Sequence, residues 1–413
     1  MITDVREIVS YDPVREVWKH LRLFLNVDGT AERLRQLHKI PPETQGDNLK
    51  KQARQIGYCI RQAEEYFKAS EEVGLATRPL LLYYGCVALS QALILTKKDG
   101  TFSLDASRKS GKHRHHGLEL ERGLVDSAAK VRGLYEFFSM IKASLCMSPG
   151  GEAVGHFPLF FSCLDPPAFV LRANIVDRGR TSSLIHTIPQ VCADLQPLSR
   201  LVGKSLSCGE IVLTLPDLYA TLVQLGAGPT IRPGDVTRSI VNDYSIGAPA
   251  TGDLSPGAPA PDPVLEKITL IDNFFINGLT EVEKEILLKL YQRNSNIRIE
   301  GQFPSNLHLV FEVQAKTWQD MGSGYYPDIV DDLHGQKYFI LRPETYLPEP
   351  ASMLFITYCL GMLSRYFPDV WMTVTDSRVE VAEVTNTLLE VIQRKFPTLI
   401  LDQITGLKHY IQP

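Results

Sequence analysis

The chain has 413 residues, of which 44% are hydrophobic and 22% are charged, and its formal net charge is −4. A chain of this length can form two or three domains and bury a large core without disulfides or bound metal. The near balance of charge excludes an overall basic surface, so any nucleic-acid contact requires a local patch. The seven cysteines never stand in a CxxC or CxxH spacing, which excludes a zinc finger and favours reduced thiols.

The first 75 residues predict two amphipathic helices. Charges recur every few positions near the start, so the continuous apolar segment of a signal peptide is missing. Apolar residues at helical spacing predict a helix over residues 13–25, with Asp12 as N-cap and Pro13 at its first position. The same spacing predicts a second helix over residues 47–73.

An almost wholly apolar segment follows, from Leu80 to Leu95. Its polar residues are Ser90, Gln91 and two tyrosines, so a helix here is apolar around most of its circumference. The segment is shorter than the roughly 18 to 20 apolar residues that a membrane span requires. We therefore predict a buried core helix and expect a cytoplasmic protein without a membrane segment.

Further helical spacing extends the N-terminal region. Apolar residues in register predict a helix over residues 127–145, which Gly133 weakens but does not forbid. Residues 1–150 are thus predicted to form one all-helical domain.

The pattern changes after residue 150. Short runs rich in β-branched and aromatic residues predict a small antiparallel sheet within a middle region, residues 151–345. A stretch rich in Pro, Gly and Ala over residues 246–264 is predicted to be a flexible loop. The predicted strands are Ile211–Leu215, Ile268–Ile271, Ile297–Ile299, Leu307–Val313 and Tyr338–Leu341.

Helical spacing returns in residues 346–413. A mostly apolar helix is predicted over residues 350–367, then a short connection with Trp371, then an amphipathic helix over residues 379–396. The helix at 350–367 is the natural partner of the helix at 80–95. We therefore predict a mainly helical α+β fold, in which N- and C-terminal helices form one bundle-like body with the sheet inserted between them.

A basic loop after the apolar helix concentrates positive charge and imidazole. This density suits phosphate or nucleic acid, and a solvated, anion-contacting loop is one interpretation. A histidine metal site is a weaker one, because the two adjacent histidines point apart in regular geometry, and we predict neither a metal nor a cofactor. The candidate phosphate-binding residues are Arg108, Lys109, Lys112, Arg114 and His116.

The same loop suggests a catalytic alternative. Arg108 is followed after five and seven positions by His113 and His115, and this arrangement resembles the Arg/His signature of HEPN-type ribonucleases. That resemblance implies a four-helix bundle that dimerises and cleaves RNA without metal. A histidine can move the 2′-hydroxyl proton while an arginine stabilises the charge on phosphorus. Arg108, His113 and His115 are therefore the candidate catalytic residues.

Three further segments resemble the bacterial YaaC-like family. They are AEEYFKASEEVGLATRPLLLYYGCVALSQALIL at 63–95, the His-Gly-Leu at 116–118, and SMLFITYCLGMLSRYFPDVW at 352–371. The resemblance covers both helical ends of the chain. The family has no defined function, so the resemblance implies no catalytic residues. Within these segments, His116 is the one residue that could take part in chemistry.

Two functions follow as hypotheses. The first is a helical protein that binds RNA, another polyanion or a protein partner, as a component of a bacterial stress or antiviral defence system. The alternative is a metal-independent HEPN-type ribonuclease. Both hypotheses are compatible with a homodimer.

Overall fold

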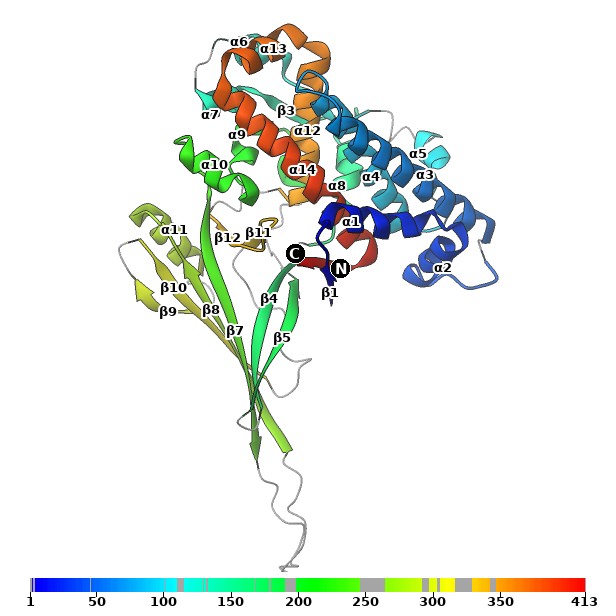
Figure 1. Ribbon diagram of the computed structural model, residues 1–413. Coiled ribbons are helices and arrows are strands. Elements are labelled where there is room, and N and C mark those ends of the chain that lie inside the picture. The colour runs from blue at the N-terminus through cyan, green and yellow to red at the C-terminus, as the bar shows by residue number, and fades with distance from the viewer. Residues whose placement is uncertain are drawn as a thin grey trace, which may run out of the picture.

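The computed structural model describes residues 2, 4–44, 46–100, 102–109, 115–128, 130, 133–166, 168–177, 180–189, 198–245, 264–291, 297–302, 305–315, 329–341 and 347–412. Helices from both ends of the chain gather at one end of the molecule, and the long strands of the middle region project away from them (Figure 1). The fold is α+β and mainly helical, as the sequence predicts.

The helical body is built from the predicted long helices. α4 lies at its centre and packs against α3, α12 and α14. The Asp12 carboxylate accepts a hydrogen bond from the Arg15 backbone N–H at 3.0 Å, which confirms the predicted N-cap. The helices are α1 (Pro13–Arg22), η1 (Leu23–Leu25), α2 (Val27–Leu37), α3 (Gly46–Glu71), α4 (Arg78–Lys97), α12 (Glu349–Tyr366), α13 (Pro368–Ser377) and α14 (Val379–Thr405).

The burial of α4 depends on close helix contacts. Two glycines provide them: a Cβ on Gly85 would lie 2.7 Å from the Phe67 ring, and one on Gly361 of α12 would lie 3.2 Å from Tyr83. Within the described residues, α4 is the one helix long and apolar enough to cross a membrane, and 72% of that apolar window is buried in the core. Packing inside the helical body therefore explains why α4 is so apolar.

A three-stranded sheet of order β2-β3-β6 lies beside this body. Its strands are β2 (Leu118–Leu120), β3 (Lys142–Leu145) and β6 (Ser205–Ser207), all antiparallel. The short helices around it are α5 (Leu104–Lys109), α6 (Arg122–Ala128), α7 (Leu134–Met140), α8 (His156–Phe161), α9 (Cys208–Val212), α10 (Tyr219–Gln224), η2 (Leu198–Leu201) and η3 (Pro216–Leu218).

Two predictions fail in this region. The predicted helix over residues 127–145 is wrong as one continuous element: α7 covers residues 134–140, but residues 142–145 pair as a central strand with alternate side chains buried. The predicted strand Ile211–Leu215 is also wrong, since Ile211 and Val212 are the last residues of α9, a helix that the Ser207 hydroxyl caps at its start. Residues 1–150 are therefore not all helical.

The middle region contains an eight-stranded sheet of order β11-β12-β7-β8-β10-β9, with β4 and β5 attached at β7. All pairs are antiparallel except β4 with β7. The other four predicted strands are confirmed within β8, β9, β10 and β12, while nearly all of the predicted flexible loop at 246–264 lies outside the described residues. The strands are β4 (Ala168–Asp177), β5 (Arg180–Pro189), β7 (Ile231–Ser245), β8 (Val264–Ile276), β9 (Ile297–Gln302), β10 (Leu307–Ala315), β11 (Ile329–Asp331) and β12 (Lys337–Ile340), and α11 (Glu281–Tyr291) packs on the sheet through Leu287.

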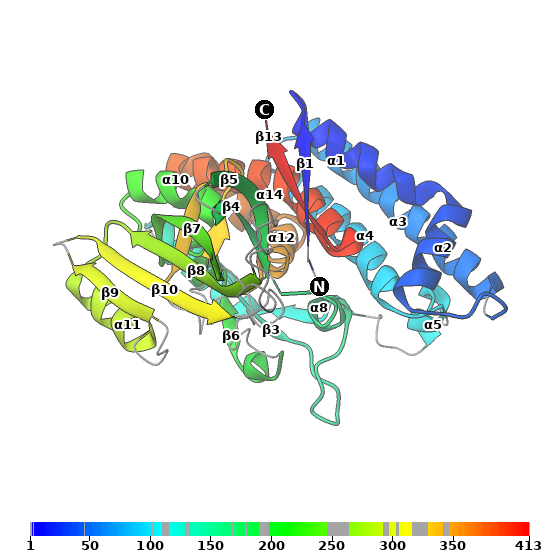
Figure 2. The same ribbon diagram turned by 90° about the horizontal axis from the view of Figure 1, so that it is seen from below.

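The two ends of the described chain meet in a parallel pair of strands. β1 (Asp4–Val9) pairs along its length with β13 (Leu407–Gln412), and Figure 2 shows the two strands side by side. α14 continues past its predicted end through Pro397 and stops at Gly406, whose φ of 71° is left-handed. Trp371 lies on α13 instead of in a connection, and its indole N–H donates to the Leu75 carbonyl at 2.8 Å.

Candidate functional site

The predicted basic loop is only partly described. Arg108 lies in the last turn of α5, but its side chain is outside the described residues, as are Lys112, His113 and Arg114. Lys109 and His115 are exposed. Convergence of Arg108 with His113 or His115 on one phosphate therefore stays a prediction.

The end of that loop is fixed against the start of α8. The His115 and His116 carbonyls accept hydrogen bonds from the backbone N–H groups of His156 (2.9 Å) and Phe157 (3.0 Å). Gly117 has a φ of +84°, and a Cβ there would lie 2.5 Å from Pro158. These contacts hold the His116 imidazole in one place on the surface.

The His116 ring lies among tyrosines of two core helices. Its Nδ1 is 2.6 Å from the Tyr83 hydroxyl of α4, and its ring centroid is 5.7 Å from that of Tyr358 on α12. The Tyr358 hydroxyl in turn donates to the Leu118 carbonyl at 2.8 Å. Burial, then the charges of Arg365 and His115, lowers the pKa of His116, so the imidazole is neutral near pH 7.

Arg365 extends this group to the surface. Its guanidinium is exposed and donates to the Tyr84 hydroxyl at 2.7 Å, and the Tyr84 ring stacks with Tyr66 of α3 at 5.8 Å between centroids. The Tyr366 ring, 5.0 Å from the guanidinium carbon, is 55% exposed. We name this group the His116 cluster: Tyr66, Tyr83, Tyr84, His116, Tyr358, Arg365 and Tyr366.

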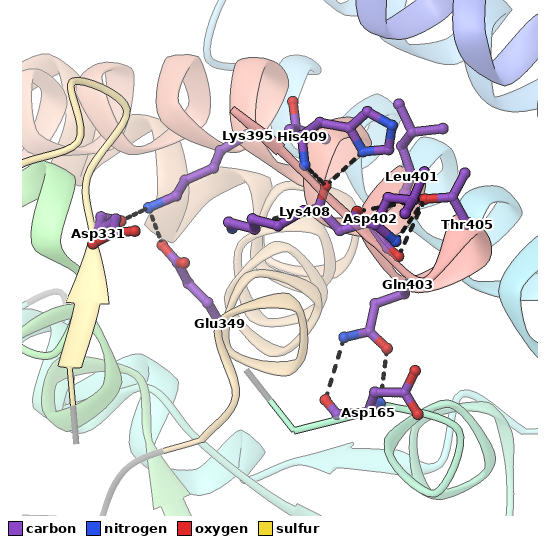
Figure 3. A network of polar contacts seen from close by, with 12 residues as sticks. Asp165, Asp331, Glu349, Lys395, Leu401, Asp402, Gln403, Thr405, Lys408 and His409 are labelled. Atoms are coloured by element: carbon purple, nitrogen blue, oxygen red, sulfur yellow. Dashed lines mark hydrogen bonds and ion pairs between the residues drawn. The ribbon is translucent and has the colours of Figure 1, made fainter. Parts of the chain in front are cut away.

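A second group of ionisable side chains is buried where α14 meets the large sheet (Figure 3). Lys395 of α14 donates to the Asp217 carboxylate (2.7 Å) and to the Asp331 carbonyl of β11 (2.6 Å), and its Nζ lies 2.5 Å from Glu349 Oε1. The Lys395 and Asp217 side chains are 8% and 4% exposed. One ammonium group thus joins α14, η3, β11 and the start of α12.

The charges of this buried group are strongly coupled. Burial raises the pKa of Glu349 to about 7, against the opposing attraction of Lys395. Burial also lowers the pKa of Lys395, but the charges of Glu349 and Asp217 outweigh it and raise that pKa above its usual value. Lys395 therefore stays charged at neutral pH, and Glu349 is the member of the pair whose raised pKa lies near neutrality.

A cavity of about 340 Å³ adjoins this network, between the β11–β12 turn, α14 and β13. Its volume falls in the range of small-molecule pockets. Two of the lysines that line it already have carboxylate partners: Lys337 lies 3.2 Å from Asp331, and Lys408 lies 3.1 Å from Asp402. The first ion pair joins β12 to β11 within the large sheet, and the second joins β13 to α14.

Sequence reasoning missed most of these residues. Tyr83, Tyr84 and Arg365 stand inside apolar helices and look like packing residues. Lys395 gives one usable signal, since it occupies an apolar position three residues after Ile392 and is therefore aimed at the interior.

The His116 cluster brings together the three segments that resemble the YaaC-like family, which are separated by up to several hundred residues in the sequence. The family model described as "YaaC-like Protein" matches residues 24–165 and 176–404. No curated protein and no solved structure matches the chain. Because the family match covers most of its length, the chain belongs to the YaaC-like family.

Proposed function

We propose that the protein binds single-stranded RNA through the His116 cluster. The observation that supports this best is the exposed Arg365 guanidinium beside the stacked Tyr84 and Tyr66 rings. A guanidinium pairs with phosphate through a planar set of donors, and aromatic faces stack with unpaired bases. The neutral His116 imidazole adds a hydrogen-bonding group at the same surface.

The sequence around the cluster favours the same ligand. Residues 108–114, rich in lysine and arginine, lead directly into His115 and His116. A basic segment beside stacking side chains is typical of surfaces that follow a nucleic-acid backbone. We expect this binding in the cytoplasm; a role in stress or antiviral defence, a protein partner and a homodimer stay predictions from the sequence.

The test is binding of a fluorescently labelled single-stranded RNA, measured by anisotropy at two salt concentrations. Arg365→Gln is expected to weaken binding about tenfold and to reduce the salt slope by about 0.7, the value for one phosphate contact. Tyr66→Leu is expected to weaken it by about 5- to 150-fold, the range for one lost base stack of about 1–3 kcal/mol.

Arg180→Gln provides the matched control, because Arg180 is an exposed arginine at the start of β5 on the projecting sheet. It should bind RNA as the wild type does. RNA affinities of Arg365→Gln and Tyr66→Leu equal to that of Arg180→Gln would refute the proposal.

Metal-independent RNA cleavage is the second candidate. The lowered pKa of His116 beside the Arg365 guanidinium favours it, since a neutral imidazole can accept a proton near a charge that stabilises the transition state. Labelled RNA is incubated in EDTA with the wild type, with His113→Ala/His115→Ala and with His116→Ala. Cleavage that survives all these substitutions would eliminate the catalytic proposal.

A further inference from the structure

A pair of histidines lies where the two ends of the chain meet, away from the His116 cluster. His409 is on β13 and His20 is near the end of α1, and their ring centroids are 6.0 Å apart. In strand register His409 stands opposite Arg6 of β1. The pair thus bridges the first helix and the last strand of the described chain.

His409 is held in one tautomer. Its Nδ1 lies 2.8 Å from Asp402 Oδ1, which also accepts the His409 backbone N–H at 2.8 Å (Figure 3). An ionised carboxylate can only accept, so Nδ1 carries the proton and Nε2 has a free lone pair. The imidazole is 1% exposed, and its Nε2 has no hydrogen-bond partner among the described residues.

That orphaned nitrogen requires an explanation. Leaving a buried acceptor without a partner is unfavourable, and a water molecule or an ion bound at the site supplies the missing partner. Asp402 suits such a site, because a carboxylate that accepts the Nδ1 proton fixes the tautomer and the orientation of the ring.

His20 has the same arrangement. Its Nδ1 lies 2.8 Å from the Glu16 carbonyl oxygen, one turn earlier in α1, and a carbonyl can only accept. With Nδ1 as the donor to that carbonyl, the ring lone pair of His20 is on Nε2. The side chain is half-buried, which leaves a path from solvent to the pair.

We propose that His20 and His409 bind a divalent transition-metal ion, of which Zn²⁺ is the representative, through their Nε2 atoms. Neutral imidazoles whose Nδ1 protons are bound by a carbonyl and a carboxylate are the usual form of histidine ligands. Imidazole prefers zinc, copper and nickel over magnesium and calcium.

The spacing is compatible with a shared ion. With metal–nitrogen bonds of about 2.0–2.1 Å, two imidazoles on one tetrahedral ion have centroids about 5 Å apart. The observed 6.0 Å differs by about 1 Å, which a rotation of the half-buried His20 side chain can supply. The described residues contain no group of three or more His, Cys, Asp or Glu placed to hold a metal, so water completes the coordination.

The ion would join α1 to β13 and so strengthen the closure that the β1–β13 pairing begins. Metal that binds the folded chain and not the unfolded one raises its stability. This gives the site a readout that is independent of any activity.

The experiment titrates Zn²⁺ into metal-stripped full-length protein by calorimetry, with Mg²⁺ as the ion control. Loop histidines could also bind Zn²⁺, so the variants are chosen to separate the two places. His20→Gln, in which an amide can still reach the Glu16 carbonyl, is expected to lose one bound Zn²⁺ per chain and the Zn²⁺-dependent rise in thermal midpoint. The loop variant His113→Ala/His115→Ala/His116→Ala is expected to keep that bound Zn²⁺ and the Zn²⁺-dependent rise in thermal midpoint.

In EDTA the wild type and His20→Gln should unfold at the same midpoint, which shows that the variant is folded. The proposal is overturned if metal-stripped wild type binds no Zn²⁺. It is equally overturned if His20→Gln keeps wild-type stoichiometry and affinity while the loop variant loses them.

Discussion

Replacing Lys395 with methionine removes the charge that joins four elements and keeps most of the side-chain volume. The ammonium group contacts Asp217, Glu349 and the Asp331 carbonyl, and the side chain is 8% exposed. Methionine fills the same space, so the effect reports the lost charge and not a cavity. Two buried carboxylates lose their partner.

The expected loss is large. Removing one member of a buried ion pair costs about 3–5 kcal/mol, because the remaining charge stays desolvated. We therefore expect Lys395→Met to lower the free energy of unfolding by about 3–5 kcal/mol at pH 8, where Glu349 is ionised in the wild type.

The loss depends on pH through Glu349. Its folded pKa, about 7, lies above the unfolded value, so its burial destabilises the protein as pH rises from about 4.5 through 7. Without Lys395 that pKa rises further, because an attraction that lowered it is gone. The difference between variant and wild type should therefore be smaller at pH 5.5, where Glu349 is protonated in both.

Urea unfolding at pH 8 and pH 5.5 measures both effects. Lys19→Met is the matched control, since Lys19 is 68% exposed beside Glu16 and should lose under about 1 kcal/mol. The double variant Lys395→Met/Glu349→Gln should recover part of the loss, because an amide tolerates burial better than a carboxylate. A loss in Lys395→Met no larger than that in Lys19→Met, or one that grows at pH 5.5, would refute the reasoning.

Three further substitutions test the packing by thermal or urea unfolding. Gly85→Ala should cost about 1–3 kcal/mol, because its methyl group would meet the Phe67 ring; an unchanged midpoint would show that the ring moves aside freely. Tyr358→Phe should cost about 1–2 kcal/mol by leaving the Leu118 carbonyl without its donor, and an equal stability would mean that water replaces it. Gly406→Ala should cost about 1–2 kcal/mol because of its left-handed backbone, and a stabilised variant would contradict that geometry.

The long helices could be predicted because their signals are local. Pro79 in the first turn of α4 and the apolar circumference of that helix are readable from a few residues. The pairing of α4 with α12 could be inferred as well, since two helices apolar on most sides have to cover each other.

The short elements could not be predicted because neighbours decide them. Ile141 and Leu145 stand four residues apart, a spacing that suits a helix, yet β2 and β6 flank residues 142–145 and make them a strand. The pairing of β1 with β13 is equally invisible, because it joins segments roughly 400 residues apart.

The candidate site was predicted only at its most charged part. His116 was identified from its basic surroundings, but Tyr84 and Arg365 look like ordinary helix residues until α4 and α12 are placed side by side. The buried network was hidden for the same reason, since Lys395 and Asp217 meet only in the folded chain.

The parallel pairing of β1 with β13 also sets an order of events during synthesis. Residues 4–9 leave the ribosome long before residues 407–412, and at about 5–20 residues per second the delay is roughly 20 to 80 s. Throughout that time residues 4–9 lack the segment that they pair with in the folded chain. Residues 4–9 carry charges at Asp4, Arg6 and Glu7. Charged side chains on an unpaired edge strand prevent it from pairing with the wrong sheet.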